Sequence, residues 1–288
     1  MRRLKMNKTL YTMCGAIVLA LAACADGTSV EPNTSYAEGN SLWNPLAGDF
    51  SVNTARYAEK LPENLQADGH WFWETKGDDD DGGRSYVEWP VKLGSGVDSL
   101  STVIESCQGI CGIARLNRGE LNYDPFVGVG FTIARDETGR PTPVDVSDWG
   151  GICITYKSEI APFLVLVLDD SESKVLEDGY AFPFVSLPKA RSGEITRCYS
   201  WDKFQLPSWF RGVPAYWSDN VGEKAAQRLV GIMFKMQNAP GEYAFSISYV
   251  GMNTEDDSGI EVREEGFQRD GWSPLLKRGT VNDDAEDK

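Results

Sequence analysis

Short segments with a two-residue hydrophobic period, separated by turn residues, constrain the fold of this 288-residue chain most strongly. In residues 126–134, Val127, Val129 and Phe131 alternate with small residues, as expected for a half-buried strand. Residues 163–168 form a continuous apolar run, which suits a fully buried strand. Many short strands of this kind predict a β-sandwich or barrel. Further strands are predicted at residues 71–74, 86–89, 151–157, 180–187, 195–201, 229–237 and 242–250, and a helix at 222–229.

The N-terminus has the pattern of a bacterial export signal. Four basic residues precede an apolar stretch, residues 9–23, and small residues lead directly to Cys24. This stretch is shorter than the roughly 18–20 apolar residues that cross a bilayer. The cysteine after small residues resembles the lipobox of bacterial lipoproteins, which implies removal of residues 1–23 and lipidation of Cys24. Plain secretion and a retained anchor are the alternatives.

The position of the mature protein follows from the same resemblance. Ala25 stands where the best-known lipoproteins that stay at the inner membrane have aspartate. We therefore expect a lipid-anchored protein of the cell envelope, at the outer membrane or cell surface. The predicted organisation is a signal peptide (1–23), a lipidated cysteine with a flexible polar tether (24–42), a β domain (43–252) and an acidic C-terminal extension (253–288).

The charge of the chain excludes two classes of partner. The formal net charge is −15, and loss of a signal with four basic and no acidic residues makes it four units more negative. Such a surface repels nucleic-acid phosphates and anionic lipid headgroups. We therefore expect no nucleic-acid partner and contact with the membrane only through the N-terminal lipid.

Four cysteines remain in the predicted β domain: Cys107, Cys111, Cys153 and Cys198. An exported chain meets an oxidising compartment, so an even number predicts disulfides. Of the three possible pairings we favour Cys107 with Cys111 and Cys153 with Cys198. The alternative is a four-cysteine zinc site, which usually needs two closely spaced pairs, and Cys153 and Cys198 are not closely spaced.

Motifs along the predicted strands resemble a known family. They are an acidic turn at residues 80–85, Gly-Val-Gly-Phe at 128–131, Val-Asp-x-Ser-x-Trp-x-Gly-Ile at 144–152, Trp-x-x-Phe-x-x-Pro-x-Trp at 201–209, and a strand at 226–237. This set is similar to jelly-roll carbohydrate-binding modules of the family-eleven type, to lipoproteins of that fold, and to complex I intermediate-associated proteins. The resemblance covers roughly residues 69–251. It implies an all-β, two-sheet antiparallel jelly-roll sandwich with short helical turns, whose concave face binds a glucan chain.

Aromatic residues are the first candidates for ligand contacts. The flat apolar face of a sugar ring matches the face of an aromatic ring, so aromatic platforms near polar groups suit glycan binding. Trp217 and Tyr216 lie in a loop rich in proline and glycine, and Trp209 lies at its start. The alternative is that these rings pack inside the fold or against their own loop.

Polar residues on the outward phase of the strands form a second set of candidates. Hydroxyl-rich glycans need hydrogen-bond donors and acceptors, and an ordinary solvated sheet face is the alternative. If the apolar residues of each strand point inward, the polar residues that could floor a shallow groove are Thr132, Thr155, Lys157, Lys235 and Gln237.

The sequence gives little support for metal or catalytic chemistry. The acidic run at residues 78–81 does not fit the ligand spacing of a calcium loop in either register. A structural calcium ion is still an alternative, but no residues of this chain are assigned as its ligands. His70 is the only histidine, and no Gly-x-Ser-x-Gly motif is present. We therefore expect no cofactor and no catalytic residues. A glycosidase needs only two carboxylates, however, and the 43 acidic residues of the chain do not exclude such a pair.

The function predicted from these patterns is non-catalytic binding of a polysaccharide, a plant-type glucan or a related polymer, by a monomeric, membrane-anchored lipoprotein. One alternative is a structural or assembly lipoprotein that binds a protein partner. The other is a glycan-cleaving enzyme.

Overall fold

The computed structural model describes residues 40–54, 61–75, 79–169, 182–208, 210 and 217–254. The predicted signal peptide with Cys24, nearly all of the predicted tether and C-terminal extension, and the loop residues Trp209 and Tyr216 lie outside this part of the chain. The described residues belong to one unit, Ser35–Lys288.

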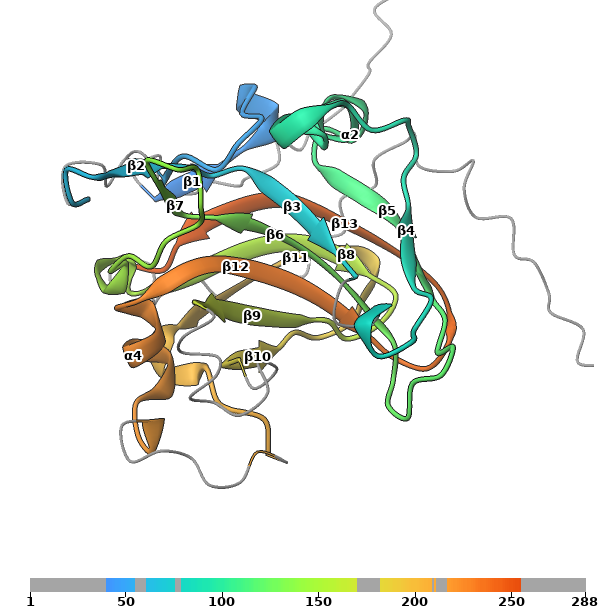
Figure 1. Ribbon diagram of the computed structural model, residues 1–288. Helices are drawn as coiled ribbons and strands as arrows, with labels where there is room; N and C mark the ends of the chain where they lie inside the picture. Colours follow the sequence, from blue (N-terminus) through green and yellow to red (C-terminus); the bar gives the residue numbers. More distant parts are fainter. Residues whose placement is uncertain are drawn as a thin grey trace, which may run out of the picture. The chain divides into compact units, whose positions relative to one another are not determined.

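Two antiparallel sheets stack face to face in Figure 1. The five-stranded sheet has the order β10 (Phe184–Ser186), β9 (Phe163–Leu168), β12 (Leu229–Gln237), β6 (Phe126–Thr132) and β3 (Trp71–Glu74). The six-stranded sheet has the order β11 (Ala190–Ser200), β8 (Gly151–Ser158), β13 (Gly241–Met252), β5 (Ile110–Leu116) and β4 (Tyr86–Glu88), and β1 (Ser41–Trp43) also pairs with β13. The chain crosses repeatedly between the sheets. The predicted two-sheet antiparallel jelly-roll sandwich is confirmed.

Short elements cover the ends of the sandwich. A two-stranded ribbon joins β2 (Leu65–Ala67) to β7 (Ala134–Asp136). The helix predicted at 222–229 is α4 (Val221–Ala226), which ends where the chain enters β12. No helix in the described ranges is long and apolar enough to span a bilayer. The remaining elements are α2 (Ser101–Cys107) and the 3₁₀ turns η1 (Pro45–Ala47), η3 (Gly96–Asp98), η4 (Ser147–Trp149) and η5 (Trp201–Lys203).

The core fills the space between the two sheets. Because successive side chains of a strand point to opposite faces, each strand contributes every second residue. Phe131 and Ile232 from one sheet and Ile154 and Ile247 from the other are all buried in this layer. Trp71 packs edge-on against Phe131, with ring centroids 5.4 Å apart. The inward phase predicted from the sequence is therefore the observed one.

Two disulfides involve strands of the six-stranded sheet, and both predicted pairs are confirmed. Cys107 at the end of α2 is bonded to Cys111 in β5. Cys153 in β8 is bonded to Cys198, its direct neighbour across the sheet in β11. With all four thiols committed to disulfides, the alternative of a four-cysteine zinc site is excluded.

Candidate functional site

The outer face of the five-stranded sheet carries two rows of side chains that run across its strands. The strand register defines them, because residues paired across neighbouring strands share a face. The apolar row contains Phe184, Val165, Met233, Gly130 and Phe72. The charged row, one pleat further along, contains Ser186, Phe163, Lys235, Gly128 and Glu74.

The ring of Phe72 reaches over its neighbour in the apolar row, which it can do because that neighbour is a glycine. A Cβ atom on Gly130 would lie 2.8 Å from Cζ of Phe72, which is closer than real Cβ contacts. The phenyl ring therefore occupies the space that a side chain at Gly130 would fill. Met233 lies over Gly128 of the charged row in the same way. Phe72 is half-buried, so part of its ring faces solvent. The result is a partly exposed aromatic platform over Gly130 on this face.

Three of the predicted polar residues lie on this face. Lys235 belongs to the charged row, and its Nζ lies 3.9 Å from the ring centroid of Phe126. Gln237 donates a hydrogen bond from Nε2 to the carbonyl oxygen of Asp124, at 2.8 Å. Thr132, at the end of β6, donates its hydroxyl to Asp68. Lys235 lies one pleat from Met233 on β12, and Thr132 lies one pleat from Gly130 on β6.

The prediction of one groove floored by five polar residues is wrong. Thr155 and Lys157 belong to β8, which lies in the six-stranded sheet. The Thr155 hydroxyl is hydrogen-bonded there to the hydroxyl of Thr196, at 2.8 Å. A two-residue period assigns a side chain to the inner or outer face of its own strand, but it does not say which sheet the strand joins. The predicted residues are therefore divided between opposite outer faces of the sandwich.

The structure also corrects the prediction that the Trp217 ring lies open to a ligand. Trp217 is 1% exposed and belongs to the hydrophobic core, with the guanidinium carbon of Arg228 at 5.9 Å from its ring centroid. An indole that is buried to this extent has no free face for a sugar. Tyr216 and Trp209 lie outside the described residues, so their predicted role stays a prediction.

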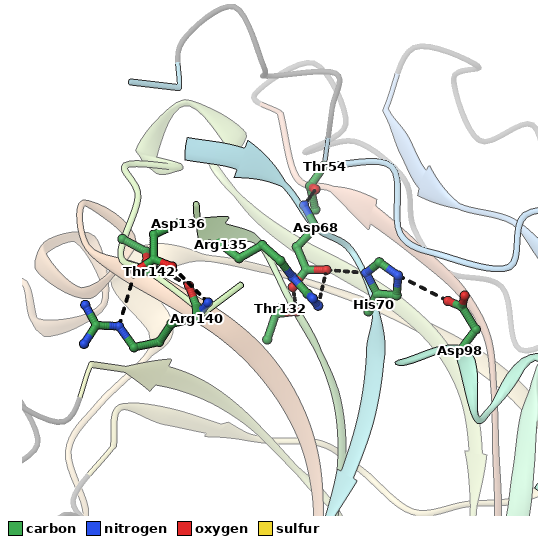
Figure 2. A network of polar contacts seen from close by, with 9 residues as sticks. All are labelled: Thr54, Asp68, His70, Asp98, Thr132, Arg135, Asp136, Arg140 and Thr142. Atoms are coloured by element: carbon green, nitrogen blue, oxygen red, sulfur yellow. Dashed lines mark hydrogen bonds and ion pairs between the residues drawn. The ribbon is translucent and has the colours of Figure 1, made fainter. Parts of the chain in front are cut away.

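A network of polar contacts holds the start of β3 through His70, two residues before Phe72 (Figure 2). The Asp68 carboxylate is fully buried and forms an ion pair with Arg135 at 2.7 Å. It also accepts hydrogen bonds from Thr132 and His70. The other ring nitrogen of His70, Nε2, lies 3.2 Å from Oδ1 of Asp98 on η3. The network thus ties β2, β3, β6, β7 and η3 together at one end of the sheet.

Charge and hydrogen bonding stabilise the ionised form of Asp68. Burial alone would raise the pKa of this carboxyl. The hydrogen bonds from Arg135, Thr132 and His70, together with the Arg135 charge, outweigh burial and lower the pKa below its usual value. A fully buried carboxylate with these partners is not accessible to a substrate, so we assign the network a structural role. It positions the strand that carries Phe72.

Sequence reasoning missed Phe72, although a usable signal was present. If Trp71 points into the core, then Phe72 must point outward. The strand pattern Gly128-Val129-Gly130 leaves room on its outer face, which suggests that an outward aromatic side chain can pack over it. Only the strand register shows that Phe72 and Gly130 are paired. Asp68 carried no local signal, because Thr132 and Arg135 are distant from it in the sequence.

The described residues include no group of three or more histidine, cysteine or acidic side chains placed to hold a metal ion. The candidate site is therefore defined by the two rows on the outer face of the five-stranded sheet, supported by the Asp68 network.

Comparison with known proteins gives weak similarities. No family model matches the chain. Endoglucanase 3 of Fibrobacter succinogenes is 28% identical over 128 residues, which are 44% of this chain and 18% of that protein. The chain thus spans less than a fifth of the length of this relative, and the match does not establish a family.

Solved structures with a similar fold include carbohydrate-binding modules. The family 11 module of the cellulosomal cellulase Lic26A-Cel5E of Clostridium thermocellum is 13% identical, with 68% of this chain and 91% of that chain covered and a TM-score of 0.35. The family 11 module in complex with a β-1,3-1,4-mixed-linked tetrasaccharide is 11% identical, with 68% and 92% covered and a TM-score of 0.34. An agarase, AgWH50C, is 10% identical, with 74% and 26% covered and a TM-score of 0.33. The family 11 modules are of the family that the sequence motifs resemble, and the fold of this chain rests on its own strand order.

Proposed function

We propose that this protein binds a polysaccharide, without cleaving it, on the outer face of the five-stranded sheet. The observation that carries the proposal is the platform formed by Phe72 over Gly130. Phe72 is half-buried, and the C–H face of a sugar can stack on the exposed part of an aromatic ring. The charged row beside it supplies an ammonium donor, Lys235, and a carboxylate acceptor, Glu74, for sugar hydroxyls.

The dimensions of the face favour a polymer over a single sugar. Each row crosses five strands, and strands about 4.8 Å apart make such a row about 19 Å long. Val165 and Met233, in the middle of the apolar row, are only 5% and 3% exposed, so a glycan chain lying along the rows would contact Phe72 at one end and the pair of Phe163 and Phe184 at the other. These two rings pack edge to face, with centroids 5.3 Å apart.

The composition of the two rows supports binding without cleavage. A glycosidase places two carboxylates on either side of the bond that it cleaves. Among the ten residues of the two rows, Glu74 is the only acid. The purified chain should therefore release no reducing ends from mixed-linkage glucan, xylan or cellulose. Release that is lost in Glu74→Gln would instead establish the enzyme alternative.

The lipoprotein signal supports a lipid anchor for this binding face. We place the protein on the cell envelope, attached through Cys24, where a binding face at the end of a tether can reach a polymer. Incorporation of a labelled fatty acid into the mature chain tests this part of the proposal. A mature chain that carries no acyl group would remove the anchor and leave the binding proposal standing.

The variant Phe72→Ala should weaken glycan binding about tenfold or more. It removes the stacking surface, and an aromatic contact is worth about 0.5–1.5 kcal/mol beyond the area that it buries. Retardation in native gels that contain mixed-linkage glucan, xylan or hydroxyethyl cellulose measures the effect. Phe50→Ala is the matched control, because Phe50 is 52% exposed and belongs to neither row. Equal retardation of wild type and Phe72→Ala in every gel that retards wild type would contradict the proposed face.

A further inference from the structure

The outer face of the six-stranded sheet carries a second exposed aromatic ring. Tyr86, on the edge strand β4, is 51% exposed. It pairs across the sheet with Arg115 in β5, and Arg115 pairs with Glu242 in β13. Val87 points into the core, so Tyr86 and Glu88, on either side of it, point outward. This cluster and the Phe72 platform therefore lie on opposite outer faces of the sandwich.

Arg115 holds two carboxylates in fixed positions beside Tyr86. Its Nε donates to Glu88 and its Nη1 to Glu242. The side chains are 27% exposed for Arg115, 44% for Glu88 and 63% for Glu242. Within the described part of the chain, the second carboxylate oxygens, Oε1 of Glu88 and Oε2 of Glu242, have no hydrogen-bond partner. They are therefore preoriented acceptors at the surface.

The ion pairs of this cluster contribute little to stability. Exposed ion pairs add about 0–1 kcal/mol to folding, and half of the Tyr86 surface remains in contact with water. A ring with fixed acceptors beside it matches a sugar, whose C–H face can stack while its hydroxyls donate to the carboxylates. Two carboxylates against one guanidinium leave the cluster negative, which favours a neutral glycan over an acidic one.

We propose that Tyr86, Arg115, Glu88 and Glu242 form a second glycan-binding site, so that one chain holds two glycan segments, one on each outer face. The ligand class rests on the proposed function, and the site itself rests on the geometry of this cluster. A protein with two such sites would bridge neighbouring polysaccharide chains, and it would bind an insoluble polymer more tightly than either site alone.

Calorimetric titration of the purified chain with a mixed-linkage tetrasaccharide, cellohexaose and xylohexaose tests the second site. Wild type should bind two molecules of at least one probe. Tyr86→Ala and Phe72→Ala should each bind one molecule, and the double variant none. Tyr86→Phe keeps the ring and should still bind two. Circular dichroism should show the same fold in every variant.

The outcomes separate the two proposals. If Tyr86→Ala binds as many molecules as wild type while Phe72→Ala loses all binding, the second site is overturned and the five-stranded face stands. If Phe72→Ala is unchanged and Tyr86→Ala loses all binding, the five-stranded face is overturned and the Tyr86 site stands. If wild type binds none of the three probes, both are overturned.

Discussion

Replacing Asp68 with asparagine should lower the free energy of unfolding by about 3–5 kcal/mol at pH 7. The Asp68 side chain is fully buried, and Arg135 lies at 2.7 Å, with its own side chain only 25% exposed. Asparagine keeps the size of the side chain but loses the charge, and its NH₂ group is a donor placed among donors from Arg135, Thr132 and His70. Removing one member of a buried ion pair leaves the other charge uncompensated, which is why the expected loss is large.

The loss should depend on pH in a defined direction. The pKa of Asp68 is lowered in the folded protein relative to the unfolded chain, where an aspartate has a pKa of about 3.9. The ionised carboxylate therefore contributes stability that is fully present above the unfolded pKa and is lost as pH falls through the folded pKa. The difference in unfolding free energy between wild type and Asp68→Asn should be constant from pH 7 to about 5 and should shrink below about pH 4.

Urea unfolding followed by circular dichroism at pH 7, 5, 4 and 3 measures this difference. Asp136→Asn is the control, because Asp136 lies in the adjacent β7 and its hydrogen bonds with Thr138 and Arg140 are near the surface. It should cost much less than Asp68→Asn. Equal losses for the two variants, or a gap that does not change with pH, would show that the buried carboxylate does not stabilise the fold in this way.

The sequence predicts the strands of this protein better than their arrangement. Residues 163–168 and 229–237 are strands with the predicted boundaries, because each is a clear apolar or alternating run between turn residues. Alternation also identified the inward phase of β6 and β8. It could not place Thr132 and Thr155 on opposite faces of the sandwich, because the choice of sheet depends on pairing between strands that are distant in the sequence.

Several short described elements escaped prediction, among them β5 and α2, each for a local reason. Two of the inward positions of β5 are the small residues Gly112 and Ala114, and the apolar Ile113 between them faces outward with Glu88, so the alternation of this strand is weak. A Cβ on Gly112 would lie 2.9 Å from a methyl group of Val87, so the core needs a glycine there. The helix α2 has only seven residues and includes β-branched side chains, which gives too little periodic signal for a helix. The Tyr86 cluster depends on β5 and was therefore also invisible in the sequence.

Replacing Trp217 with alanine should destabilise the fold by about 3–5 kcal/mol and leave glycan affinity unchanged where the variant is folded. Trp217 is 1% exposed in the core, so its loss removes buried apolar surface and leaves a cavity. A loop rich in proline and glycine favours an exposed ring from its composition alone, but packing against the sandwich decides the outcome.

Trp73→Ala is the matched control, since Trp73 is 40% exposed at the edge of the five-stranded sheet and contacts Trp89 at 6.5 Å between ring centroids. Its stability loss should be clearly smaller than that of Trp217→Ala in urea unfolding followed by far-ultraviolet circular dichroism. Affinity gels run where both variants are folded complete the comparison. A Trp217→Ala protein with wild-type stability and weakened retardation would mean that this ring faces the ligand after all, and the site would then have to extend from the five-stranded face to the end of the sandwich near α4.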